Sequence, residues 1–362
     1  NNLGIVLYMQ GRLEDAEYSY ARAIEIGPDY SEAHNNLGVT LEKLGKLEEA
    51  EISGRRAVAI KPNFPEAHSN LGVTLMSAEK FEEASDVLDK DLIKLVKEGP
   101  VEDINKTINT QIIMLTSGVA FWSAWKKMGG VNPKVMAGHS LGEYVALVAG
   151  ESLTFRNALN LVHIRSTLMQ NAVPDGVGGI AAIIGLNPII VEDICVKASS
   201  KDSLVSAANF NSPIQTVIAG HRTAVERAIE LASQKGAKRA VMLPMSVPSH
   251  CSLLSPMIEN FSSALDDAEI RLPAIPILHN ASLKVAKTVE EIRKVLVQQV
   301  VMPVNWTKLV NIFITEYQTS KIFELGPSKI LTGLNKRISK DVENMPIDSL
   351  QSMEKNIIKI GD

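Results

Sequence analysis

The sequence predicts an α-helical repeat segment followed by an α/β domain within one chain of 362 residues. A 34-residue periodicity in the first part indicates stacked helices, and an apolar run followed by Gly-His-Ser-Leu-Gly indicates a strand–turn–helix unit. The charge changes near the same boundary, since residues 1–90 carry 9 basic and 16 acidic side chains whereas the remainder carries 28 and 25. Together with the length, these observations predict at least two modules.

The composition excludes several classes of protein. Apolar residues make up 45% and charged residues 22%, which is typical of a globular chain and not of a disordered or fibrous one. A net charge of −4 provides no general field for binding nucleic acid. The two cysteines, Cys195 and Cys251, form no disulfide framework, so we expect a cytoplasmic protein. No apolar run is long enough for a transmembrane helix, and no signal peptide is visible.

The repeats occupy residues 1–88. Asn-Leu-Gly begins at Asn2 and recurs at offsets of 34, and a second position keeps alanine at the same spacing: Asn2, Asn36 and Asn70; Ala16, Ala50 and Ala84. This pattern resembles a tetratricopeptide repeat array with two full repeats and part of a third. About three repeats are usually needed for a continuous core, so we expect the array to pack on the next module or on residues missing from this sequence.

Three asparagines of the array are candidate ligand contacts. Asn2, Asn36 and Asn70 occupy the position that, in similar repeats, binds extended peptides. The alternative interpretation is equally strong: they are polar residues on an exposed concave face.

The candidate nucleophile is Ser140. The apolar run Val135–Ala137 predicts a buried strand, Gly138-His139-Ser140-Leu141-Gly142 follows it, and residues 143–149 have a helical pattern. A G-x-S-x-G turn between strand and helix holds its serine in a strained, exposed conformation. The amide of Leu141 would then be directed at the same site and could stabilise an oxyanion.

A serine hydroxyl needs a general base, and His250 is the candidate. It lies in the loop 246–251, after the apolar run Ala240–Leu243, and it follows the serine in chain order, as in α/β acyl-transfer enzymes. On spacing alone, a structural histidine is the alternative. The strand and helix order between Ser140 and His250 predicts a ferredoxin-like subdomain at about residues 175–245.

No cofactor is expected. The glycine-rich stretch at 176–181 follows a turn rather than a strand, which argues against a dinucleotide site. Neither a P-loop nor a His-Glu-x-x-His motif occurs, so no nucleotide or metal site is predicted.

Four motifs in order give a specific resemblance over about residues 81–350: the residues 138–144, 209–213, 247–250 and 324–327. They resemble the malonyl-CoA:acyl carrier protein transacylases of fatty acid biosynthesis. The resemblance implies an α/β-hydrolase-like core in which Ser140 attacks malonyl-CoA with His250 as base. A malonyl-serine ester then passes its acyl group to acyl carrier protein.

The same resemblance implies two substrate-binding residues. Arg165 matches the arginine that binds the malonate carboxylate, for which a planar guanidinium fork is suited. Gln299 matches a glutamine that lines the active site, although Gln298 leaves the alignment open by one position.

One departure bears on activity. Family members begin with a strand and a Gly-Gln-Gly loop that supplies the second oxyanion donor, and this chain contains no Gly-Gln-Gly. The repeats replace about thirty residues there, with the join near residues 81–85. Loss of one donor typically costs about 10²–10³ in kcat, so weak or absent transfer is expected. Two alternatives remain: a peptide-binding repeat scaffold with a catalytically defective acyltransferase-like half, and a serine esterase, which Arg165 disfavours.

Overall fold

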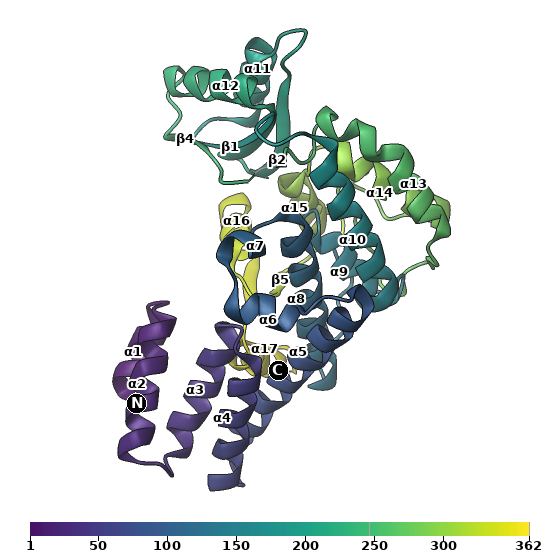
Figure 1. Cartoon of the computed structure of the whole chain (residues 1–362). Coiled ribbons are helices and arrows are strands. Elements are labelled where there is room, and N and C mark those ends of the chain that lie inside the picture. The colour runs from purple at the N-terminus through teal and green to yellow at the C-terminus, as the bar shows by residue number, and fades with distance from the viewer. Residues whose placement is uncertain (246, 362) are drawn as a thin grey trace.

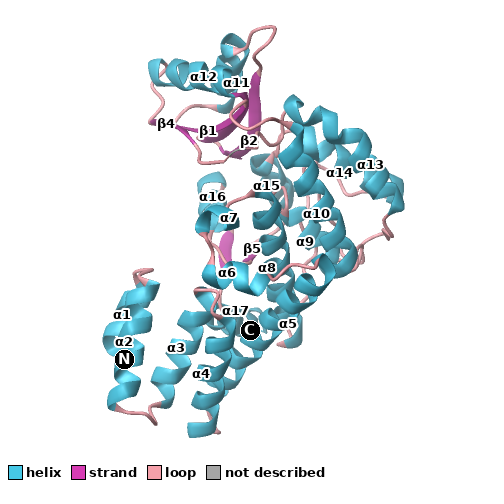
Figure 2. Cartoon of the chain, in the orientation of Figure 1, coloured by secondary structure: helices cyan, strands magenta, loops and turns pink. Residues whose placement is uncertain are grey.

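A computed structural model describes residues 1–245 and 247–361. The molecule has three parts that follow one another in space. The helical array lies at one end, a helix-rich central unit follows, and a small sheet covered by two helices lies at the opposite end (Figure 1). Among the residues that the structure describes, the strands form the small sheet and a short pair in the central unit (Figure 2).

The array consists of antiparallel helices joined by tight turns. Gly11 and Gly45 occupy two of these turns with φ of +76° and +75°, a region that favours glycine. Gly4 lies under the ring of Tyr20, where an added Cβ would be 2.6 Å from Cε1. The helices are α1 (Asn2–Met9), α2 (Leu13–Ile26), α3 (Ser31–Lys43), α4 (Leu47–Ile60) and α5 (Pro65–Leu88).

The third repeat differs from the first two because its helices merge into α5, a single helix of 24 residues. The position equivalent to Gly45 is Glu79, which a helix accommodates without a break. Phe81 and Ala84 of α5, with Leu47 of α4, belong to the main hydrophobic core of the central unit. This shared core confirms that the array packs on the next module.

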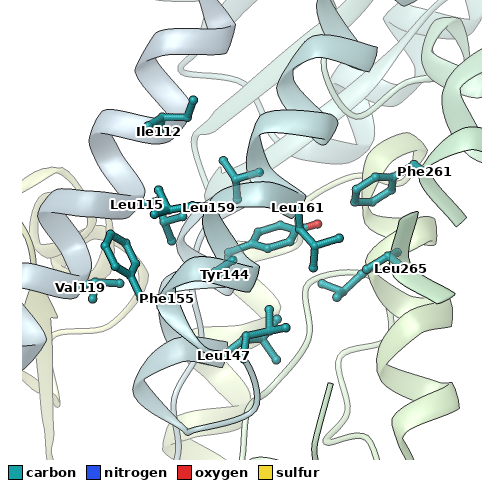
Figure 3. Close-up of a cluster of buried hydrophobic side chains, with 14 of the residues drawn as sticks. Ile112, Leu115, Val119, Tyr144, Leu147, Phe155, Leu159, Leu161, Phe261 and Leu265 are labelled. Carbon is teal, nitrogen blue, oxygen red and sulfur yellow. The ribbon is translucent and has the colours of Figure 1, made fainter. Parts of the chain in front are cut away.

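The central unit is built mainly from helices around that core. Figure 3 shows Leu115 of α8 and Phe155 of α10 beside Tyr144 of α9, with Phe261 of α13 across from them. None of the described helices is long and apolar enough to cross a membrane. The elements are α6 (Leu92–Glu98), α7 (Val101–Ile104), α8 (Thr107–Lys127), α9 (Gly142–Ala149), α10 (Phe155–Ala172), η1 (Ser252–Met257), α13 (Ile258–Asp267), α14 (Val289–Val301), α15 (Trp306–Thr315), β5 (Lys321–Leu325), α16 (Ile330–Ile338), β6 (Glu343–Ile347) and α17 (Leu350–Gly361).

The sheet of the central unit is smaller than the sequence predicts. β5 and β6 pair in parallel, but the run Val135–Ala137 forms only one parallel bridge, between Met136 and Ile277. A strand needs a ladder of pairings to be regular, and the second edge of this run faces a cavity instead of a neighbour. The expected buried strand is therefore reduced to a half-buried extended segment.

The small sheet agrees closely with the predicted order of elements. Its strand order is β2-β3-β1-β4, all three neighbouring pairs are antiparallel, and the helices pack on it through a separate hydrophobic cluster. Its elements are β1 (Gly178–Ile184), α11 (Pro188–Ala198), β2 (Val205–Ser212), β3 (Gln215–His221), α12 (Arg222–Gln234) and β4 (Arg239–Met242).

A carboxylate links the array to the far end of the central unit. Asp348, which follows β6, is 3.3 Å from Nζ of Lys43 at the end of α3 and 3.0 Å from Nζ of Lys329 before α16. Although burial raises the pKa of the Asp348 carboxyl, the two lysines lower it below its usual value overall. The array is thus fixed by an ion pair as well as by apolar packing.

Candidate active site

Ser140 lies in a sharp turn that only a glycine at position 138 permits. Its φ is +50°, in the left-handed region, and a Cβ on Gly138 would be 1.8 Å from the carbonyl carbon of Gly142. The side chain of Asn280 closes the turn, because its Oδ1 accepts from the Ser140 amide at 2.8 Å and its Nδ2 donates to Gly138 O at 2.6 Å. The hydroxyl is thereby directed out of the turn.

The structure brings His250 to this hydroxyl from 110 residues further along the chain. Nε2 lies 2.8 Å from Ser140 Oγ, and Nδ1 lies 2.8 Å from the carbonyl oxygen of Gln299. A carbonyl only accepts, so Nδ1 carries the proton and Nε2 is free to accept one from the serine. Burial, and then the nearby charge of Arg165, lower the pKa of His250 to about 3, which keeps the imidazole neutral.

His139, next to the serine in sequence, is directed away from it. Its Nε2 is 2.9 Å from Oδ1 of Asn211 in β2, and its ring packs at 5.7 Å from Trp306. Asn211 belongs to the 209–213 motif, so this hydrogen bond gives that motif a structural role: it fixes the His139 side chain beside the serine turn.

Arg165 is a buried cation whose contacts are neutral. It is 1% exposed on α10, and its Nη2 donates to Ser140 Oγ at 3.2 Å and to Gln299 Oε1 at 3.1 Å, while Nη1 donates to Gln111 Oε1. Within the described residues, no carboxylate lies within ion-pair distance of it, and its Nε has no partner. Burial lowers the pKa of the guanidinium, and this effect outweighs the opposite effects of Tyr144 and of the Glu143 charge.

Gln299, rather than Gln298, is the glutamine at the site. It is 1% exposed, and its Nε2 donates to Oε2 of Glu143 at 2.8 Å and to the main-chain oxygen of Ser140 at 3.1 Å. Its Oε1 accepts from Arg165, so one amide links the cation to the carboxylate. Gln298 is half-buried.

Leu141, whose amide is the expected oxyanion donor, directly precedes α9. It adjoins the serine at the start of α9, and no hydrogen-bond partner for its N–H occurs within the described residues. The second donor that the resemblance implies has no counterpart here: Gln10-Gly11, the one Gln-Gly in the sequence, lies in the turn of the first repeat.

A cavity of about 720 Å³ adjoins the turn. Gly138, His139 and Leu141 line one part of it, and β5 and residues 133–137 line another. Its volume is in the range of pockets that hold small ligands. The described residues contain no group of three or more His, Cys, Asp or Glu side chains that could hold a metal ion.

Three polar residues of the site were missed from the sequence. Gln111 contacts Arg165, Asn280 closes the serine turn, and Glu143 accepts from His279 Nδ1 at 2.6 Å as well as from Gln299. Glu143 follows the G-x-S-x-G motif directly, and Asn280 follows an apolar run, which were the only local signals.

Two of the three repeat asparagines are hydrogen-bonded to asparagines of the preceding repeat. Nδ2 of Asn36 donates to Oδ1 of Asn1 at 3.0 Å, and Nδ2 of Asn70 donates to Oδ1 of Asn35 at 2.7 Å. Asn70 is buried, whereas Asn2 is exposed at the start of α1. Two of the three amides therefore join successive repeats in this structure.

Two family models match the chain. The acyl transferase domain matches residues 72–356, and the tetratricopeptide repeat matches residues 1–63. Curated relatives include the malonyl CoA-acyl carrier protein transacylases of Salmonella typhimurium, 46% identical over 70% of this chain and 82% of the relative, and of Bacillus subtilis, 36% identical over 75% and 85%.

Solved structures of transacylases are also similar to this chain. The malonyl CoA-acyl carrier protein transacylase of Coxiella burnetii has a TM-score of 0.78 and 40% identity, over 81% of this chain and 93% of that one. A malonyl-transacylase in complex with its type II PKS acyl-carrier protein has a TM-score of 0.76 and 42% identity, over 78% and 91%.

Proposed function

Because the chain belongs to the acyl transferase domain family, with tetratricopeptide repeats before that domain, we propose that it transfers malonyl from malonyl-CoA to acyl carrier protein by way of a malonyl ester on Ser140. The relatives described above are named as malonyl transacylases. The observation that carries the proposal is the buried Arg165, because a guanidinium that hydrogen-bonds only neutral side chains, beside a reactive serine, favours an anionic substrate.

The first half-reaction forms the ester. Ser140 Oγ passes its proton to Nε2 of His250 and attacks the thioester carbonyl, while Arg165 binds the free carboxylate of the malonyl group. The tetrahedral oxyanion is stabilised by the Leu141 amide. His250 then returns the proton to the departing sulfur of coenzyme A.

The second half-reaction reverses these roles. The thiol of acyl carrier protein gives its proton to Nε2 of His250 and attacks the ester carbonyl. The ester bond to Ser140 then breaks, and His250 returns the proton to Ser140 Oγ. The Gln299 carbonyl keeps the imidazole in one tautomer throughout, in place of the aspartate of a Ser-His-Asp triad. No cofactor is required, because the coenzyme A thioester is the substrate.

We expect the turnover of this chain to be low. The Leu141 amide is one donor, and the Gly-Gln-Gly loop that supplies the other in the family is absent from the sequence. The expected loss is about 10²–10³ in kcat. The competing proposal, a peptide-binding scaffold with an inactive acyltransferase half, predicts no ester at all.

The decisive experiment is acylation by malonyl-CoA, followed by intact-protein mass spectrometry and peptide mapping. We expect one malonyl group on Ser140, no adduct in Ser140→Ala, and transfer of the group on addition of acyl carrier protein. Arg165→Ala should lose about 10- to 150-fold in malonyl acylation, the worth of hydrogen bonds to a charged group, and should shift preference toward acetyl-CoA. Arg156→Ala, an exposed arginine of the same helix, is the matched control. Absence of any adduct in the folded protein would favour the scaffold.

Finer features of the architecture are part of the same proposal. The order β1-α11-β2-β3-α12-β4, with strands arranged β2-β3-β1-β4, supports a ferredoxin-like subdomain over about residues 175–245. The turn at Ser140 supports an α/β-hydrolase-like core. Two buried cysteines with free thiols support action in a reducing cytoplasm.

A further inference from the structure

The large cavity has two strand edges in its walls. Residues 135–137 line it on one side and β5 lines it on another. Each of these segments already pairs with a neighbour on its far side, Met136 with Ile277 and β5 with β6. The free edges of two separate pairings therefore face one shared space.

The backbone groups on the first edge are identifiable from the bonds on the other. Met136 uses both of its groups toward residues 276–278, because its amide donates to Pro276 O and its carbonyl accepts from the Leu278 amide. Backbone groups alternate in direction along an extended chain, so those of Val135 and Ala137 are directed to the cavity side. Within the described residues, no hydrogen bond satisfies them.

The same alternation applies to β5. Ser320 O accepts from the Glu343 amide and the Gly326 amide donates to Ile347 O, so the even-numbered residues between them bond to β6. The N–H and C=O groups of Lys321, Phe323 and Leu325 are then directed away from β6, and these residues line the cavity.

We propose that this cavity, the 135/323 channel between residues 135–137 and β5, binds an extended apolar polypeptide segment that pairs with both edges as an added strand. Only a polypeptide backbone offers donors and acceptors alternately on both sides at the spacing of a strand. The proposal concerns a partner of the protein and is independent of whether Ser140 forms an ester.

The side chains around the channel specify what the segment must carry. Helix α8 contributes Gly118 and Trp122, and α16 contributes Leu331 and Leu334, so apolar groups line it beyond the two edges. A strand between such helices is covered on both faces and is therefore a continuous apolar run rather than an alternating one. β-Branched residues are the best fit, since they favour extended backbone.

All three tryptophans of the chain, Trp122, Trp125 and Trp306, line the cavity, so intrinsic fluorescence reports occupancy directly. The probe is a synthetic peptide of five alternating valine and isoleucine residues, with a lysine at each end for solubility. We expect saturable change in tryptophan emission as this peptide is added to the full-length protein.

Two N-methylated versions of the peptide separate strand pairing from simple apolar binding. Methylation of the odd-numbered amides blocks donation to one edge, and methylation of the even-numbered amides blocks donation to the other. We expect each version to bind at least about 10-fold more weakly, because several backbone hydrogen bonds are lost. Equal binding of either version to the parent would overturn the proposal, since it would show an apolar pocket of the kind that takes small molecules or acyl chains.

A protein variant tests the second edge independently. Lys321→Pro removes one amide that faces the channel at the first residue of β5, where proline is tolerated, and Lys321→Ala keeps it. We expect Lys321→Pro to bind the peptide about 2- to 12-fold more weakly than Lys321→Ala, the range for one backbone hydrogen bond. If Lys321→Pro fails to fold, binding of the two N-methylated peptides to the wild-type protein still tests the proposal. No emission change up to about 1 mM peptide would refute the channel as a strand site.

Discussion

Nδ1 of His250 and the main-chain oxygen of Gln299 lie 2.8 Å apart, so the base is oriented by backbone and not by a side chain. The side chain of Gln299 has a separate task, because it joins Arg165 to Glu143. The two contacts of one residue can therefore be separated by substitution.

We predict that Gln299→Ala lowers kcat/KM for malonyl-CoA about 10- to 150-fold, since it removes hydrogen bonds to two charged groups and leaves the imidazole in place. His250→Ala should lose at least about 10³-fold, because the base itself is absent. Steady-state and single-turnover acylation rates measure the difference. An equal loss in the two variants would mean that the amide, and not the carbonyl, orients the base.

The glycines of the serine turn make a second prediction. A Cβ at Gly138 would meet the backbone of Gly142 and Glu143 at 1.8–2.2 Å, whereas nothing lies within 4 Å of a Cβ at Gly142. Backbone cannot move aside without opening the turn, so Gly138→Ala should abolish acylation of Ser140 and destabilise the fold. Gly142→Ala should keep both, as followed by mass spectrometry and thermal unfolding. Comparable behaviour of the two alanine variants would contradict the packing described here.

The two glycines show which features of the serine turn could be predicted from the sequence and which could not. The G-x-S-x-G spacing predicts the turn because strand, turn and helix are neighbours along the chain. The motif does not distinguish the two glycines, although only Gly138 lies in close contact with the backbone at the start of the helix. The pairing of Ser140 with His250 rested on chain order and on resemblance, and the place of Arg165 on resemblance alone, since no local pattern carries contacts between distant residues.

Gln111 and Asn280 were not predicted, again because their contacts are with residues distant in sequence. Each is a single amide whose role depends on a partner more than fifty residues away, Arg165 for Gln111 and Ser140 for Asn280. The merging of the third repeat into α5 was equally hidden, because a glutamate in place of a turn glycine is visible only by comparing repeats. The shortened strand at 135–137 depends on a neighbour that the described chain does not provide.

A third prediction concerns the junction between array and central unit. Asp348→Asn should lower the free energy of unfolding by about 1–3 kcal/mol, because two lysines lose the buried carboxylate that accepts from them. Asp341→Asn, at an exposed position in the same C-terminal region, is the control and should change it little. Urea unfolding of both variants measures the difference. No difference between them would show that apolar packing alone fixes the array.

The last prediction follows from the low pKa of His250. In the folded protein this pKa is about 3, and in the unfolded chain it is about 6.5. Above pH 6.5 neither state binds the proton. Between pH 6.5 and 3 the unfolded state binds it and the folded state does not, so stability is lost as the pH falls through this window.

The size of that loss is about 1.4 kcal/mol per pH unit, or about 2 kcal/mol between pH 7 and pH 5. Burial also lowers the pKa values of His139 and His163, but those groups remain in a His250→Gln variant. The difference between wild type and His250→Gln therefore isolates one imidazole, and urea unfolding at the two pH values measures it. The same neutrality should keep Ser140 acylation nearly constant from pH 7 to 5, whereas the basic form of an ordinary imidazole would decrease about 25-fold over that range. An acylation rate that falls with an apparent pKa near 6.5 would show that His250 is solvated in the working protein and not buried as described.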